Sequence, residues 1–110
     1  MKKSTEICSA ARHVGEEKAV ELYAKAGFEC FDFSMCDMVK VDWSNMTVSK
    51  SDHPLSSSDY ISFAKRVRNV ADACGIECNQ SHAPFPTLVV GLDYIKRAIE
   101  CTAIAGGKIC

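Results

Sequence analysis

The feature that most constrains the fold is a short phrase that recurs along the chain. Residues 26–30 read Ala-Gly-Phe-Glu-Cys, and residues 74–78 read Cys-Gly-Ile-Glu-Cys. Residues 105–110, Ala-Gly-Gly-Lys-Ile-Cys, begin the phrase again. Each time, a helical pattern ends on a small residue and a glycine, and a strand-like run follows. This repetition predicts alternating β and α units with parallel strands and right-handed crossovers.

Apolar spacing predicts the elements between these repeats. We expect helices over residues 16–26, 59–74 and 91 or 92 to 105, with Ser58 as the cap of the second. We expect strands over residues 28–35 and 76–81, a further strand from 108, and a weaker first strand over 6–11. The polar stretch 36–58 is expected to be a long loop, and such loops in compact domains are often functional.

Composition limits the classes of protein to which the chain can belong. A length of 110 residues, 47% of them hydrophobic, predicts a single domain over residues 1–110 with its own core. Thirteen basic and fourteen acidic side chains give a net charge of −1, which favours neither nucleic acid nor a membrane surface as a partner. No apolar run is long enough to cross a membrane.

Cysteine is frequent, with seven residues and no C-x-x-C pair. This pattern favours reduced thiols in a cytoplasmic protein, with a disulfide framework or a metal site as the alternatives. Cys30, Cys78 and Cys110 hold equivalent places in the repeat, where a small buried side chain suits a packed strand.

His82 is the strongest candidate for a functional residue. It follows the strand predicted over 76–81, at the sheet edge where β/α proteins place their sites. Two-residue alternation would put Cys78 and Gln80 on the same face as His82. The imidazole could bind a divalent metal or hydrogen-bond a substrate hydroxyl, or it could simply cap the strand.

Four further residues are weaker candidates. Asp32 interrupts an apolar strand, so it either orients a catalytic group or satisfies nearby donors. Trp43 in the long connection could stack on a sugar ring or pin the loop to the body. His53 in the same connection is expected to be solvated, and His13 is expected to follow the first strand.

Two stretches resemble a known group of enzymes. Residues 27–34, Gly-Phe-Glu-Cys-Phe-Asp-Phe-Ser, resemble the second-strand signature of the xylose-isomerase-like TIM barrels. Residues 74–85, Cys-Gly-Ile-Glu-Cys-Asn-Gln-Ser-His-Ala-Pro-Phe, resemble their third strand and its loop. The resemblance implies an α/β fold, a partial (β/α)8 barrel comprising about the first three to four βα units with parallel strands.

The resemblance also implies a function. The group includes sugar phosphate isomerases and epimerases that use a divalent metal such as Mn, Mg, Co or Zn. The implied substrate-binding residues are His82, Asp32, Gln80 and Trp43, for a sugar or a sugar phosphate. His82 is also a candidate metal ligand, because the related apurinic endonucleases use a histidine at this place for zinc. Most acidic bases and metal ligands of the group lie on later strands. We therefore expect an N-terminal portion that is inactive alone, and no catalytic residue is identified.

Two other functions are consistent with these residues. The chain could be a half-barrel that associates with a second copy through exposed sheet edges, in a binding or structural role. It could also be a relative of the metal-dependent apurinic endonucleases, against which the lack of clustered basic residues argues.

Overall fold

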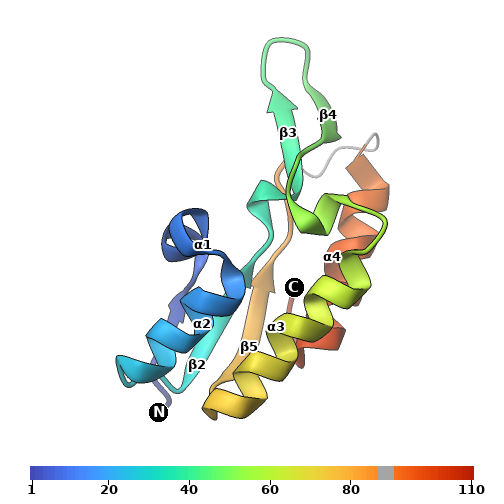
Figure 1. Ribbon diagram of the computed structural model, residues 1–110. Coiled ribbons are helices and arrows are strands. Elements are labelled where there is room, and N and C mark those ends of the chain that lie inside the picture. Colours follow the sequence, from blue (N-terminus) through green and yellow to red (C-terminus); the bar gives the residue numbers. More distant parts are fainter. Residues whose placement is uncertain (87–90) are drawn as a thin grey trace.

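The computed structural model describes residues 1–86 and 91–110, which form a mixed α/β fold (Figure 1). The elements in chain order are β1 (Ser4–Glu6), α1 (Cys8–Val14), α2 (Glu16–Lys25), β2 (Cys30–Ser34), η1 (Cys36–Met38), β3 (Val39–Asp42), β4 (Thr47–Lys50), η2 (Pro54–Ser56), α3 (Tyr60–Cys74), β5 (Glu77–His82) and α4 (Leu92–Ala105). Strands β1, β2 and β5 form a parallel sheet in that order, whereas β3 and β4 form a separate antiparallel hairpin. The α/β class with parallel strands is therefore confirmed.

The core lies between the parallel sheet and three of the helices. Helix α2 packs against α3, α3 packs against α4, and both α3 and α4 contact β5. Phe31 and Phe33 of β2 are fully buried in one cluster with Val20, Val67 and Cys101 of these helices. Since the strands follow one another in chain order, right-handed crossovers place the helices on one side of the sheet.

The predicted helices are confirmed as α2, α3 and α4, and the two predicted central strands correspond to β2 and to β5, which extends one residue further, to His82. The glycines of the repeat act as expected at the helix ends. Gly75 and Gly106, which follow α3 and α4, have φ angles of +69° and +91°. Only glycine adopts this left-handed conformation without steric cost, so the repeated phrase marks where each helix stops.

The prediction of a first strand over residues 6–11 is wrong. The strand is Ser4–Glu6, and residues from Cys8 onward are helical. Ile7 is fully buried beyond the strand end, and its N–H donates to the Asp32 carbonyl at 3.3 Å. The small residues after Ile7 are compatible with a helix, and a polar edge strand leaves no apolar pattern to detect. His13 therefore lies in the last turn of α1, exposed, and does not follow a strand.

The connection over residues 36–58 is not the structureless loop expected. It contains the hairpin β3–β4, flanked by the short 3-10 helices η1 and η2. Val41 and Val48 pair across the hairpin and pack against the core. Asp42 holds the turn, because its carboxylate accepts hydrogen bonds from Ser44 and Asn45. In Figure 1 the hairpin projects beyond the carboxyl end of the sheet.

The segment predicted to be a strand from residue 108 is not assigned as one. The Ser81 N–H of β5 nevertheless donates to the Ile109 carbonyl at 2.9 Å, so this segment lies along the edge of β5. Cys30 and Cys78 are buried, as predicted, but Cys110 is exposed, contrary to expectation. All seven cysteines are free.

Candidate functional site

The candidate site lies at the carboxyl ends of β2 and β5. These strands pair in parallel, with Asp32 opposite Gln80 and Ser34 opposite His82. The register shifts by one residue between Phe31 and Asp32, so Asn79 is an extra residue in β5. Such a bulge turns the side chains beyond it toward the other face of the sheet. Gln80 and His82 consequently share a face with Asp32.

Asp32 joins the other two side chains of this group. Its Oδ2 lies 2.7 Å from His82 Nδ1 and accepts a hydrogen bond of 2.7 Å from Gln80 Nε2. The Asp32 side chain is only 6% exposed, whereas that of His82 is 60% exposed. A buried carboxylate thus fixes an accessible imidazole through Nδ1, which leaves Nε2 as the ring nitrogen that can meet a ligand.

The second carboxylate oxygen of Asp32 is unusual. Oδ1 is buried and has no hydrogen-bond partner among the described residues. A buried carboxylate oxygen without a donor is costly, so such atoms are normally satisfied. This atom therefore has unused capacity to accept a hydrogen bond beside the imidazole.

Because of the bulge, the prediction that Cys78 shares a face with Gln80 and His82 is wrong. Ser81 Oγ lies 2.5 Å from Thr102 Oγ1 of α4, and the Cys78 thiol lies against Gly107 after the same helix. Cys78 thus points to the helical side of the sheet and does not share a face with Gln80 and His82. Its burial raises the pKa of the thiol to about 11.

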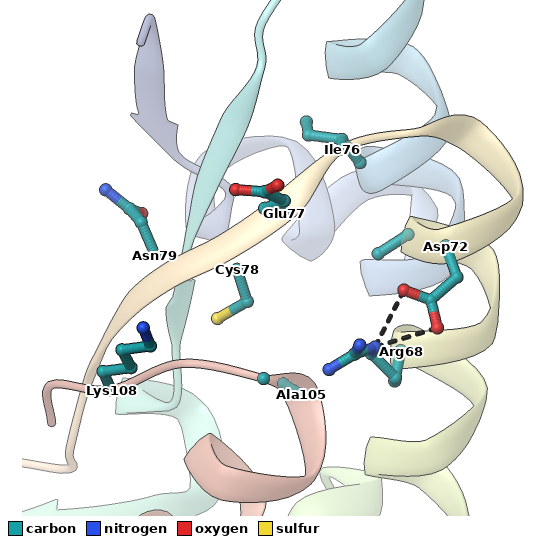
Figure 2. A pocket seen from close by; sticks show the side chains of 10 residues that line it. Arg68, Asp72, Ile76, Glu77, Cys78, Asn79, Ala105 and Lys108 are labelled. Atoms are coloured by element: carbon teal, nitrogen blue, oxygen red, sulfur yellow. Dashed lines mark hydrogen bonds and ion pairs between the residues drawn. The ribbon is translucent and has the colours of Figure 1, made fainter. Parts of the chain in front are cut away.

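Cys78 instead lines a separate cavity of about 450 Å³ (Figure 2). Arg68 and Asp72 of α3 line it together, bound to each other by hydrogen bonds of 2.8 and 2.9 Å. Glu77, at the start of β5, also lines it. The cavity therefore lies toward the amino end of β5, and none of the predicted site residues lines it.

Trp43 lies in the turn of the hairpin and is 60% exposed. Its ring centroid is 6.1 Å from that of Phe85, which is 67% exposed and lies in the loop after His82. The sequence did not single out Phe85 as a site residue, because an exposed aromatic partner cannot be found without the hairpin. Trp43 therefore packs near the loop that follows His82.

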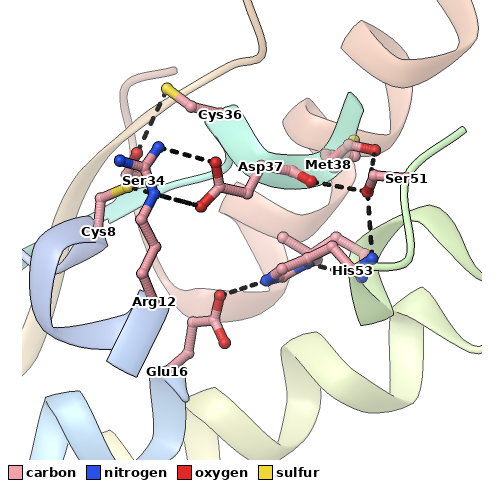
Figure 3. A network of polar contacts seen from close by, with 10 residues as sticks. Cys8, Arg12, Glu16, Ser34, Cys36, Asp37, Met38, Ser51 and His53 are labelled. Atoms are coloured by element: carbon pink, nitrogen blue, oxygen red, sulfur yellow. Dashed lines mark hydrogen bonds and ion pairs between the residues drawn. The ribbon is translucent and has the colours of Figure 1, made fainter. Parts of the chain in front are cut away.

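The prediction that His53 is solvated is wrong. Its Nε2 lies 2.5 Å from Glu16 Oε1, and its Nδ1 accepts a hydrogen bond of 3.2 Å from the Leu55 N–H (Figure 3). The ring also packs edge-on against Phe63 at 5.7 Å. Because Nδ1 is an acceptor, Nε2 carries the hydrogen and donates it to Glu16. This pair anchors the connection to the start of α2, which is a structural role.

A second polar group surrounds Asp37, beside His53 (Figure 3). Arg12 Nε and Nη2 donate to the two carboxylate oxygens at 2.7 and 2.8 Å. The guanidinium lowers the pKa of Asp37. Cys8 Sγ lies 3.9 Å from the same carboxylate. The sequence did not reveal this group, because Cys8 and Arg12 of α1 lie far from Asp37 of η1 along the chain.

The side chains of Asp32, Gln80 and His82 do not form a complete metal site. Across residues 1–86 and 91–110, no three or more His, Cys, Asp or Glu side chains gather in a way that could hold an ion. Asp32 Oδ2 already contacts Gln80 and His82, so His82 Nε2 is the accessible atom of the group that could coordinate a metal. One imidazole cannot replace the ligands that a divalent ion requires.

Comparisons with models of protein families, with curated proteins and with solved structures found no significant match to this chain. Within the described parts of the chain, no helix has the length and apolar character needed to span a bilayer.

Proposed function

We propose that this chain contributes the substrate-binding part of a sugar or sugar phosphate isomerase or epimerase. The observation that carries the proposal is the buried Asp32 carboxylate, which holds the exposed His82 imidazole at the carboxyl end of a parallel sheet. A neutral imidazole fixed in this way presents an acceptor to a sugar hydroxyl.

The aromatic pair supports a carbohydrate ligand. Trp43 and Phe85 present exposed ring surface beside the loop that follows His82. Apolar C–H faces of a sugar stack on such rings, while its hydroxyls need hydrogen-bonding groups such as His82 and Gln80. The two kinds of group together suit a ligand with one apolar face and several hydroxyls.

The arrangement of the sheet supports the partial TIM barrel as the framework. Strands β1, β2 and β5 are neighbours in chain order, and their helices pack on one side. A (β/α)8 barrel is built in this way, whereas a doubly wound sheet reverses its strand order. The polar face that carries Asp32 and His82 would then line the barrel interior at its catalytic end.

A divalent metal belongs to the proposal for the whole enzyme, with His82 as its candidate ligand in this chain. When bound, it would polarise the sugar oxygens. The described residues do not supply its other ligands, so these would come from other strands or from a second copy of the chain. The chain's own contribution is to bind and orient the hydroxyls, which predicts binding without turnover.

The sole tryptophan, Trp43, offers a direct test. We would titrate the protein with xylose, glucose, fructose and their phosphates, with and without Mg²⁺ or Mn²⁺, and follow its fluorescence. We expect a saturable change with at least one sugar, weakened about fivefold or more in His82→Ala, since a lost hydrogen bond to the ligand is worth about 1 kcal/mol or more. His13→Ala, an exposed histidine on α1, is the matched control and should bind as the wild type does. The absence of saturation with every sugar, or unchanged binding by His82→Ala, would refute the proposed site.

A further inference from the structure

Two thiols lie on either side of one hydroxyl where β1 and β2 end (Figure 3). Ser34 Oγ donates to Cys36 Sγ at 3.4 Å, and the Cys8 thiol lies on the other side of this hydroxyl, 3.9 Å from Asp37 Oδ2. Cys36 is exposed and Cys8 is partly buried. The two cysteines are 28 residues apart in the sequence, and the pairing of β1 with β2 brings them to the same hydroxyl.

The two thiols differ in their surroundings, chiefly in burial. The Cys8 thiol shares the Asp37 carboxylate with Arg12, since Cys8 Sγ lies 3.9 Å and Arg12 Nε 2.7 Å from Asp37 Oδ2. Burial and the neighbouring Asp37 raise the pKa of Cys8. Cys36 has no such burial, so it is the thiol that an oxidant in solution reaches first.

We propose that Cys8 and Cys36 are a redox modification site, which a hydroperoxide converts into an intramolecular disulfide. The Cys36 thiolate attacks the O–O bond of hydrogen peroxide, which gives a sulfenic acid and releases hydroxide. The Cys8 thiolate then attacks the Cys36 sulfur, the S–S bond forms, and a second hydroxide leaves. The two thiol protons convert both hydroxides to water, so two thiols are oxidised and one peroxide is reduced.

The disulfide would tie the start of α1 to η1 across Ser34. Ser34 lies opposite His82 in the strand register, so the bond would form beside the candidate site. The proposal rests on the two thiols and their neighbours alone. It does not depend on the proposed sugar chemistry, and either can fail without the other.

Mass spectrometry of the full chain tests this inference. After brief treatment with equimolar hydrogen peroxide, we expect a loss of about 2 Da, restored by dithiothreitol, because a disulfide carries two fewer hydrogens than two thiols. Tryptic digestion should then give peptides 4–12 and 26–40 as a linked pair. Fragmentation of that pair distinguishes Cys36 from Cys30, which lies in the same peptide.

Two variants make the result decisive. Cys8→Ser should abolish the mass loss and leave Cys36 as a sulfenic acid that a cyclic 1,3-dione labels. Cys74→Ser, which removes another exposed thiol, should oxidise as the wild type does. Retention of the mass loss in Cys8→Ser would overturn the assignment. Oxidation that instead joins separate chains through Cys74 or Cys110 would overturn it as well.

Discussion

The contact between Asp32 and His82 determines which ring nitrogen faces a ligand. Because Nδ1 of His82 lies 2.7 Å from Asp32 Oδ2, the neutral ring is expected to carry its hydrogen on Nδ1. We expect ¹⁵N spectra of the imidazoles to show a protonated Nδ1 and an unprotonated Nε2 for His82. Asp32→Asn should weaken this preference, whereas Asp52→Asn, which changes an exposed partner of Lys40, should leave it unchanged. A wild-type His82 protonated on Nε2 would contradict the described contact.

His53 is a second histidine with a carboxylate partner, but its surroundings make it structural. Both His53 and Glu16 are largely buried, with side-chain exposures of 18% and 10%. His53→Ala would leave the Glu16 carboxylate buried without a donor, so we expect a loss of about 1–3 kcal/mol of unfolding free energy. Chemical denaturation measures this loss, and His13→Ala, in the exposed last turn of α1, should change stability by less than about 0.5 kcal/mol. Equal effects of the two substitutions would show that the His53 contact contributes nothing.

At the level of the elements, the glycine of the repeated phrase has a testable role. Gly75 ends α3 with φ +69°, and a Cβ there would meet open space, so backbone conformation alone sets the cost of Gly75→Ala. We expect about 1–2 kcal/mol of destabilisation, because an alanine is strained in the left-handed region. Gly91→Ala is the matched control, since Gly91 has φ −100° and an added Cβ would touch Val48 at an ordinary distance. A thermal melt in which both variants match the wild type would contradict this role.

The hairpin turn is held by a carboxylate whose titration can be followed. Hydrogen bonds, first of all from the Ser44 hydroxyl and then from Asn45, lower the pKa of Asp42 to about 2. A pKa lowered by folding means that these bonds stabilise the turn at neutral pH and are lost as the pH falls from the ordinary value of 3.8 through about 2. The ¹³C shift of the Asp42 carboxyl should report this midpoint, and Ser44→Ala should raise it. An unchanged midpoint in that variant would exclude the Ser44 hydroxyl as a cause.

The elements also show what the sequence could and could not predict. Helices α2, α3 and α4 were predictable, since each has a long apolar stripe and ends at a small residue and a glycine. The hairpin was not, because its strands are four residues each and its turn contains no glycine. Ser58 was expected to cap α3, but α3 begins after Asp59 and has no side-chain cap. Strand β1 was missed because Ser4 and Thr5 carry no apolar alternation.

On the scale of the whole molecule, chain order and sheet order coincide, and this places the candidate site. Asp32 and His82 could be identified singly, since Asp32 is a charged residue in an apolar strand and His82 lies at a strand end. Their contact could not be predicted, because it depends on the extra residue Asn79 in β5. Strict alternation along β5 would have kept Cys78 beside His82, and the bulge separates the two.

The proposal also predicts how the whole chain behaves toward substrates. The described residues lack a group of metal ligands, so we expect binding of a sugar without its conversion. Proton NMR in D₂O, with xylose or fructose and Mg²⁺, Mn²⁺ or Co²⁺, should show neither a new sugar nor deuterium at the carbon beside the carbonyl. Turnover by this chain would show that it completes an active site, and sedimentation at several concentrations would then reveal whether a second copy takes part.

The central claim, that His82 held by Asp32 meets a sugar, is tested most directly by the ¹⁵N resonances of the imidazole rings during a sugar titration. His53, buried against Glu16, serves as the internal reference in the same spectrum. We predict that Nε2 of His82 shifts progressively to saturation, that His53 stays unchanged, and that Asp32→Asn weakens the response. A saturable sugar that leaves His82 unperturbed, or that shifts His53 equally, would contradict the account.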